Sequence, residues 1–400
     1  MYSRDRVPEP DALSAVIARL SAGLRRGSRR LLRVIGWMGI GLFTGWLGAA
    51  SADAARWRLL KVPRTARGAL LAVSCTSRAS CIAVGSSGGR RTSILAERWN
   101  GRRWSVVPAP SPRGARNAGL DAVSCLSSSQ CVAAGAYDNG GNRAWSLAMR
   151  WNGQRWSIQP TPDQPGQRAS VFDGISCVSP TSCVAVGGDG NPDDGLPFPL
   201  IERWNGTRWT IQRAARPGRN GFLSGVSCAS SRACTAVGDD GLGDPQVQRW
   251  NGRAWSVQAP YAIEEDSTAL FSVSCTSMTV CHAVGGDANS AETTSLAEHW
   301  DGRRWTGEYT PDLGGDELDA ISCTSARTCT AVGSRQGGSE MLAETWNGVR
   351  WSIQATPDGR GAGTFSRLSA VSCTSPLFCV AVGEVDDERG TLRPVAVQRS

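Results

Sequence analysis

The chain has 400 residues, of which 40% are hydrophobic and 20% charged, so it can bury a core and is not broadly disordered. Its formal net charge is +8, but residues 1–52 hold eight arginines and three acids and account for +5, which leaves +3 for the rest. A chain so close to neutral lacks the basic footprint of nucleic-acid-binding proteins, and we expect no nucleic-acid partner. The 14 cysteines, an even and high number, indicate an oxidising compartment rather than the cytosol.

The N-terminal segment 1–52 has the features of an export signal. An arginine cluster between Arg25 and Arg33 precedes the uncharged apolar run 34–50, and Ala50-Ser51-Ala52 follows. This order is typical of a secretory signal peptide, so we predict cleavage after Ala52. An uncleaved membrane anchor is the alternative, because the run approaches the length that spans a bilayer. Either way the rest of the chain is secreted or lies at the cell surface. Because Arg29-Arg30 also resembles a twin-arginine signal, the export route stays open.

A sevenfold repeat of about 50 residues fills the rest of the chain. Each copy contains [VI]-S-C-x-S-x3-C-x-A-[VA]-G, and six copies continue to W-[ND]-G-x2-W-[ST]. The first motif predicts two strands beside the cysteines, such as 71–75 and 81–84. The second predicts a hairpin with Asn100-Gly101 in a two-residue type I′ turn. Four short strands in tandem repeats predict an all-β fold, the β-propeller.

The two ends of the repeat region fit together. Repeat seven stops at Ser400, before its tryptophan hairpin, and therefore lacks a fourth strand. Segment 56–60 matches 103–107 and would supply that strand. We therefore predict a closed seven-bladed β-propeller over residues 53–400, with four strands per blade and the last blade completed by the N-terminal strand. We expect it to be a monomer.

The paired cysteines are predicted to form disulfides. Five residues separate the members of each pair across a turn between antiparallel strands, so the two partners can face each other at bridging distance. Zinc binding is the alternative, but one cysteine pair per blade without histidine partners does not make a four-ligand site. The predicted pairs are Cys75–Cys81, Cys125–Cys131, Cys177–Cys183, Cys228–Cys234, Cys275–Cys281, Cys323–Cys329 and Cys373–Cys379.

The other repeated residues are predicted to be structural. A serine before the first cysteine, such as Ser74, recurs in every repeat, which favours backbone hydrogen bonding over catalysis. Gly85 and its equivalents indicate a strand end with a special backbone angle. Trp99 and Trp104 form a diagonal cross-strand pair in this interpretation and fill the wedge between blades. Sugar rings stacked on these tryptophans are the alternative.

Candidate binding residues lie where the repeats differ. Aspartate stands just before the predicted innermost strand in three repeats, as Asp121, Asp173 and Asp319. If that strand lines a central channel, these carboxyls are near its mouth. Acidic glycine-rich loops, one of which contains Asp193 and Asp194, could hold Ca2+. None of them matches a complete D-x-[DN]-x-[DN]-G loop, so solvated turns are favoured and no cofactor or metal is assigned.

Catalytic signatures are few. The histidines are His282 and His299, and both take positions that hold ordinary strand residues in other repeats. No HExxH or P-loop motif occurs in the sequence, and no catalytic residue is assigned.

The motif VSC-x-S…C-x-A-V-G…W-N-G-x2-W resembles that of exported repeat proteins of actinobacteria, which are predicted to be β-propellers. The resemblance covers about residues 56–400. It implies a propeller fold and an extracellular location, but no particular activity.

Taken together, the sequence favours an exported, disulfide-stapled propeller that acts as a binding or scaffold module for an extracellular glycan or protein. A hydrolase or lyase acting on extracellular polysaccharide, with carboxylates at the channel mouth, is the alternative. A multivalent lectin would use equivalent positions in several blades, whereas an enzyme needs one asymmetric cluster. Membrane contact is expected only through an uncleaved N-terminal segment.

Overall fold

The computed structural model describes residues 56–63, 67–88, 91–141, 143–162, 168–190, 197–215, 221–241, 243–261, 268–287, 294–311, 314–357, 365–387 and 390–400. The predicted signal segment 1–52 lies outside these residues, as do Asp193 and Asp194. Residues Arg56–Ser400 form one compact unit. Its regular secondary structure is β-strand throughout the described residues, where no helix capable of crossing a bilayer occurs.

Repeats one to six contribute four strands each and repeat seven contributes three, which β1 completes to four; this confirms the prediction. Repeats one to three comprise β2 (Gly68–Ser77), β3 (Ser80–Gly88), β4 (Thr92–Trp99), β5 (Trp104–Val106), β6 (Asn117–Ser127), β7 (Gln130–Asp138), β8 (Ala144–Trp151), β9 (Trp156–Gln159), β10 (Ala169–Ser179), β11 (Ser182–Gly190), β12 (Phe198–Trp204) and β13 (Trp209–Ile211). Repeats four and five comprise β14 (Phe222–Ser230), β15 (Ala233–Asp239), β16 (Pro245–Trp250), β17 (Trp255–Gln258), β18 (Thr268–Ser277), β19 (Val280–Asp287), β20 (Ser295–Trp300) and β21 (Trp305–Glu308). Repeats six and seven comprise β22 (Glu317–Ser325), β23 (Thr328–Arg335), β24 (Glu340–Trp346), β25 (Trp351–Ile353), β26 (Ser366–Ser375), β27 (Phe378–Asp386) and β28 (Leu392–Arg399), together with β1 (Trp57–Leu60).

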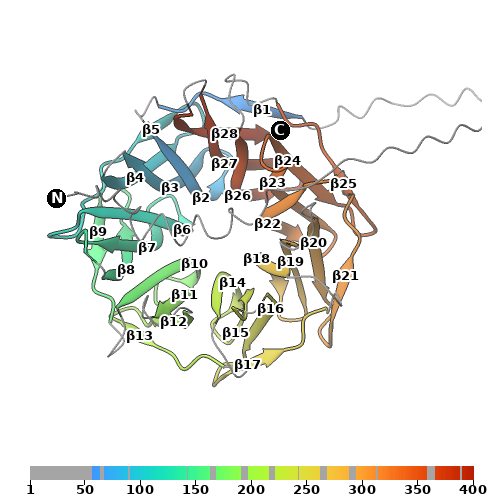
Figure 1. Ribbon diagram of the computed structural model, residues 1–400, viewed down its shortest axis with the longest axis horizontal. Coiled ribbons are helices and arrows are strands. Elements are labelled where there is room, and N and C mark those ends of the chain that lie inside the picture. The colour runs from blue at the N-terminus through green and yellow to red at the C-terminus, as the bar shows by residue number, and fades with distance from the viewer. Residues whose placement is uncertain are drawn as a thin grey trace, which may run out of the picture. The chain divides into compact units, whose positions relative to one another are not determined.

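The strands of each repeat pair antiparallel in chain order. Within the described residues this gives five four-stranded sheets and one eight-stranded sheet, in which repeats two and three are joined by a single parallel pair, Ala144 with Ala169. β1 pairs with β28, so the sheet of repeat seven takes one strand from the N-terminal side and three from the C-terminal end. The sheets follow one another around a common axis, with β2, β6, β10, β14, β18, β22 and β26 innermost, in a propeller-like arrangement (Figure 1).

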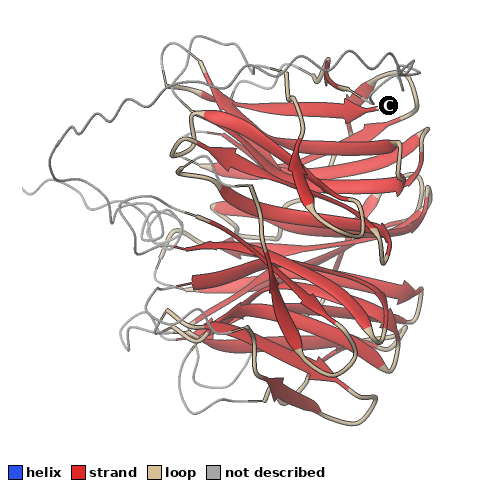
Figure 2. Cartoon of the chain, turned by 90° about the vertical axis from the view of Figure 1, so that its right-hand side faces the viewer, coloured by secondary structure: helices blue, strands red, loops and turns tan. Residues whose placement is uncertain are grey.

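One end of every sheet carries the same row of residues. In repeat one, Cys75 lies opposite Cys81, Cys81 opposite Trp99, and Trp99 opposite Trp104. Beyond this row lie two short connections, the five-residue cysteine loop and the four-residue tryptophan turn, and we call this end of the sheets the turn end. Short turns gather on one side of the molecule, where the C-terminus also lies (Figure 2).

All seven predicted disulfides are present, and no cysteine is free. Their Cα atoms are 3.9–4.0 Å apart, because the two cysteines of each pair face each other directly across the antiparallel strands.

The repeated serines connect neighbouring repeats. Ser74 Oγ accepts a hydrogen bond from the backbone N–H of Cys125 in the next repeat, at 3.0 Å. Equivalent bonds join all later repeats, and Ser372 Oγ accepts the N–H of Cys75 at 2.9 Å, so the series returns to repeat one. The predicted backbone hydrogen bonding is confirmed, and its partner is the following repeat.

The tryptophan turns differ from the prediction. Trp99 and Trp104 lie directly opposite each other, not diagonally, and four residues connect them. Only Gly101, with φ of 90°, has a positive φ in this turn. Asn100 is required for another reason, because its Oδ1 accepts the backbone N–H groups of Arg102 and Arg103 at 3.0 Å. The prediction of a type I′ turn was wrong, since the asparagine acts through its side chain rather than through its backbone angle.

The tryptophans pack between repeats, as predicted. Trp99 is 6% exposed and Trp104 4%, and the Nε1–H of Trp99 donates to the carbonyl of Arg78 at 3.1 Å. Trp151 and Trp156 of repeat two share a core with Ile82 of repeat one. Rings buried in this way offer no face on which a sugar could stack, whereas Trp250 and Trp346 are only half-buried.

Candidate functional site

A β-bulge at the same place in every innermost strand defines the candidate site. In β6, Leu120 pairs with Gly135 and Ala122 with Ala134, so Asp121 is an extra residue without a cross-strand partner. Leu120 belongs to a core shared with repeat one, whereas Ala122 belongs to a core shared with repeat three. The side chain of Asp121 is buried in neither core and keeps solvent exposure. The bulge therefore turns Asp121 toward the axis.

The bulge position differs from repeat to repeat, and all of its occupants are half-buried. They are Leu71, Asp121, Asp173, Ser224, Phe271, Asp319 and Ser369. The three predicted aspartates thus occupy one equivalent position. The prediction that they precede the innermost strand was wrong, because β6 already begins at Asn117. The bulge interrupts the alternation of buried and exposed residues that indicates a strand in the sequence.

The glycine of the C-x-A-V-G motif lies beside the bulge. A Cβ on Gly135 would lie 2.3 Å from the carbonyl oxygen of Gly119 on β6, and the six equivalent glycines show approaches of 1.8–2.1 Å to the matching carbonyls. None of these glycines has a positive φ, and β7 continues past Gly135 to Asp138. The prediction of a strand end with a special backbone angle was therefore wrong. Glycine is needed because the bulged strand comes so close.

Asp121 and Asp173 form the first group of charges at this position. They lie on the neighbouring inner strands β6 and β10, in repeats two and three. Burial raises the pKa of Asp121 from 3.8 to about 7. Burial, together with the charge of Asp121, raises the pKa of Asp173 to about 8. Two carboxyls that are partly protonated near neutral pH therefore face the axis side by side.

Asp319 belongs to a second group, on β22 and β26 in repeats six and seven. Arg367 donates to both carboxylate oxygens of Asp319, with Nε to Oδ2 at 2.6 Å, and its Nη2 lies 3.8 Å from Glu317 Oε1. Burial raises the pKa of Asp319, although Arg367 opposes the shift. Burial lowers the pKa of Arg367, but its carboxylate neighbours, including Glu384, outweigh it and raise that pKa overall.

The sequence analysis did not identify Glu317, Arg367 and Glu384 as part of this site. Glu317 and Arg367 directly precede the buried leucines Leu318 and Leu368. The other repeats have alanine, glycine, valine or phenylalanine there, so an alignment centred on this leucine would have singled out the two charged residues. The pairing of Arg367 with Asp319 needed the structure, because it joins two repeats.

In the described acidic loops, the carboxylates accept hydrogen bonds from groups in or beside the same loop. Asp239 Oδ1 accepts the backbone N–H of Gly241 at 2.7 Å, and Asp387 binds both the N–H of Thr391 and the side chain of Arg393. The described residues contain no group of three or more ligating side chains that could hold a metal ion. The loop with Asp193 and Asp194 lies outside the described residues, so the predicted solvated turn and its Ca2+-binding alternative are not tested there.

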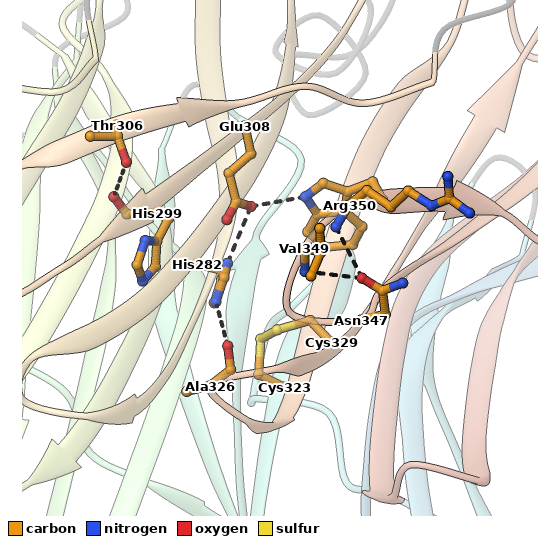
Figure 3. A network of polar contacts seen from close by, with 11 residues as sticks. His282, His299, Thr306, Glu308, Cys323, Ala326, Cys329, Asn347, Val349 and Arg350 are labelled. Carbon is orange, nitrogen blue, oxygen red and sulfur yellow. Dashed lines mark hydrogen bonds and ion pairs between the residues drawn. A yellow bond between two sulfur atoms is a disulfide. The ribbon is translucent and has the colours of Figure 1, made fainter.

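A second polar cluster joins repeats five and six away from the axis (Figure 3). His282, 1% exposed, lies with Nδ1 3.3 Å from Glu308 Oε2 and Nε2 3.4 Å from the carbonyl of Ala326. The same Glu308 oxygen accepts the Nε1–H of Trp351 at 2.8 Å. His299 stacks on His282 with ring centroids 4.7 Å apart, and burial lowers the pKa of His299. In repeats two and three, Gln159 accepts the equivalent bond from Trp209, so this cluster is a packing contact.

Replacing Glu308 by alanine is expected to destabilise the protein by about 2 kcal/mol, because His282 and the Trp351 N–H lose their buried acceptor. The double variant His282→Val/Glu308→Gln recreates the residues of repeat two, Val132 and Gln159, and should be nearly as stable as the wild type. Urea unfolding with the disulfides intact measures both. A double variant as unstable as Glu308→Ala would contradict this assignment.

Buried glutamates recur on the third strands. Glu97, Glu202, Glu298 and Glu344 stand two residues before the first tryptophan of the turn and are fully buried. Glu298 Oε2 accepts the N–H of Tyr261, a residue of the connection from repeat four, at 3.2 Å. Burial raises the pKa of both Glu97 and Glu298 to about 7. These carboxyls lie inside the sheets and not at the axis.

Comparison with known proteins yields fold similarity alone. No family model and no curated protein sequence matches the chain. Among solved structures, YCF48 bound to D1 peptide is 15% identical, with a TM-score of 0.52, over 87% of this chain and 97% of that one. YCF48 from Cyanidioschyzon merolae is 13% identical with a TM-score of 0.54, over 86% and 98%. The GH74 xyloglucanase from Xanthomonas campestris is 12% identical with a TM-score of 0.53, over 85% of this chain and 55% of that one. The chain therefore has a propeller-like fold.

Proposed function

We propose that this chain is an exported, seven-bladed β-propeller that acts as a binding or scaffold module for an extracellular glycan or protein. Three observations support the closed ring: β1 pairs with β28, β26 contacts β2, and the serine–cysteine hydrogen bonds return from Ser372 to Cys75. Seven disulfides fit an oxidising environment outside the cytosol.

The asymmetry of the axis-facing residues carries the functional proposal. The repeated cysteines and serines and most of the repeated tryptophans make contacts within the fold, so they leave no identical ligand site in each repeat. The bulge positions instead bring two carboxyls together at Asp121 and Asp173, and a neutralised pair at Asp319 and Arg367. Such an arrangement favours one ligand per ring. A cationic or hydrogen-bond-donating group of that ligand would bind to the two carboxyls between β6 and β10.

The test uses the chain from residue 53 on a glycan array and against immobilised extracellular proteins. Asp121→Asn/Asp173→Asn removes both charges with little change of shape, and we expect it to weaken ligand binding at least tenfold. The control Asp244→Asn/Glu340→Gln removes two exposed carboxylates and should bind as the wild type does. Equal binding by both double variants would contradict a site at Asp121 and Asp173.

A polysaccharide hydrolase or lyase is the second candidate, and the raised pKa values favour it. A carboxyl with a pKa of about 7 or 8 keeps its proton near neutral pH, as a general acid must, and its neighbour could act as the base. A polysaccharide-release assay separates the candidates. Turnover that disappears in Asp121→Asn or Asp173→Asn would replace the binding proposal with an enzymatic one.

A further inference from the structure

The turn end of the ring carries positive charge almost without interruption. The residue before the second tryptophan of each repeat is an exposed arginine in six of seven cases, namely Arg56, Arg103, Arg155, Arg208, Arg304 and Arg350. The cysteine loops and tryptophan turns hold six more exposed arginines and a single acid, Asp301. All of these turns belong to the described residues. We call this surface the arginine face.

These charges are not neutralised within the described part of the chain. No ion pair found there involves an arginine of this face, whereas Arg335, Arg367 and Arg393, outside it, pair with carboxylates. The small net charge of the repeat region therefore hides a separation of charge, because described carboxylates such as Asp138, Asp239 and Asp386 lie at the other end of the sheets, where β7, β15 and β27 end. A face of this kind attracts an extended anionic surface.

Exposed apolar side chains interrupt the arginine face in three consecutive repeats. Met278 in repeat five is 63% exposed, Val349 in repeat six 80%, and Leu377 in repeat seven 59%. A soluble polyanion would gain nothing from them. At a lipid headgroup boundary, by contrast, arginines bind phosphates while apolar side chains bury into the acyl region.

The course of the chain agrees with a membrane partner. Arg56 stands on the arginine face, directly before Trp57 of β1, so the preceding chain joins the repeat region there. In the uncleaved alternative to the predicted cleavage after Ala52, the apolar run 34–50 would end only six residues earlier. We propose that the arginine face docks on the surface of an anionic phospholipid bilayer, with the Asp121–Asp173 end of the inner strands turned away from it. This docking is independent of the function proposed for the axis, and it departs from the expectation that only an uncleaved N-terminal segment contacts a membrane.

Co-sedimentation of the chain from residue 53 with vesicles tests the proposal, since the compact unit begins at Arg56 and contains every disulfide. Vesicles of phosphatidylcholine with phosphatidylglycerol should bind the protein, more weakly as salt rises, and pure phosphatidylcholine should not. Arg103→Gln/Arg155→Gln/Arg350→Gln should bind about 100-fold more weakly, at about fivefold per arginine. The fold should persist, because the backbone N–H groups of these residues make the turn contacts.

The matched control is Arg67→Gln/Arg91→Gln/Arg113→Gln, which makes the same charge change at the other end of the sheets and should bind as the wild type does. An equal loss in both triple variants would overturn the proposal, because net charge alone would then explain the binding. Met278→Ser/Val349→Ser/Leu377→Ser should weaken vesicle binding, and the loss should be larger at physiological salt than at low salt. Capture of the wild type by a soluble anionic polysaccharide, without vesicle binding, would also overturn a bilayer partner.

Discussion

Replacing Gly135 by alanine is expected to lower the free energy of unfolding by about 3 kcal/mol or more. The added methyl would lie 2.3 Å from the carbonyl oxygen of Gly119, and the backbone atoms around it cannot withdraw without opening the pairing of β6 with β7. The same strands carry Asp121, so the variant should also displace the candidate site. Urea unfolding of the oxidised protein gives the change in stability.

Gly119→Ala is the matched control, since it adds the same methyl to the facing strand of the same repeat. Its Cβ would meet only the Cβ of Ser86 at 3.5 Å, an ordinary contact, and Gly119 has no positive φ. We expect its stability to stay within about 0.5 kcal/mol of the wild type. If the two alanine variants proved equally stable, the glycine would not be required by the approach of the bulge.

The second large effect is a loss of stability as pH rises from about 4 to about 8. The pKa of Asp121 is about 7 and that of Asp173 about 8 in the folded chain, against 3.8 ordinarily. The folded state therefore holds protons that the unfolded state has already released, so these carboxyls oppose folding increasingly as pH rises. A tenfold difference in proton affinity between the two states corresponds to about 1.4 kcal/mol. Asp121 and Asp173 together should therefore lower the free energy of unfolding by several kcal/mol over this pH range.

Asp121→Asn/Asp173→Asn isolates this effect. The variant should come close to the wild type in stability near pH 4, where both carboxyls are protonated in the folded chain and only partly ionised in the unfolded chain, and should exceed it at pH 8. Glu97 and Glu298, whose pKa values are also raised to about 7, leave a residual slope in the variant. Unfolding curves at several pH values measure the difference. Parallel pH profiles for variant and wild type would show that the two carboxyls ionise freely in the folded protein.

Much of the fold could be predicted from the sequence because each weakly informative motif recurs in several repeats. One C-x5-C pair is ambiguous, but seven copies in identical surroundings leave disulfides as the simplest interpretation, and all seven form. The match of 56–60 with 103–107 likewise predicted that β1 completes the sheet of repeat seven. Such inferences need only counting and local strand chemistry.

The features that the sequence did not reveal depend on contacts between strands. Asn100 looked like a backbone signal but acts through its side chain, and the motif glycine looked like a strand end but accommodates a neighbouring carbonyl. The bulge itself was hidden, because an extra residue in one strand is defined only by its partner. The pairing of Arg367 with Asp319 was hidden for the same reason, as it joins two repeats.

The bulge has a consequence for how proteins of this architecture can diverge. Its side chain belongs to neither neighbouring core, while the leucine or phenylalanine before it and the glycine opposite it keep the packing intact. Each repeat therefore offers one site where substitution leaves the neighbouring cores intact, and these sites converge on one axis. A lineage can recombine acidic, hydroxyl and aromatic groups there, as the present set of aspartates, serines, leucine and phenylalanine illustrates, and acquire a new ligand on an unchanged scaffold.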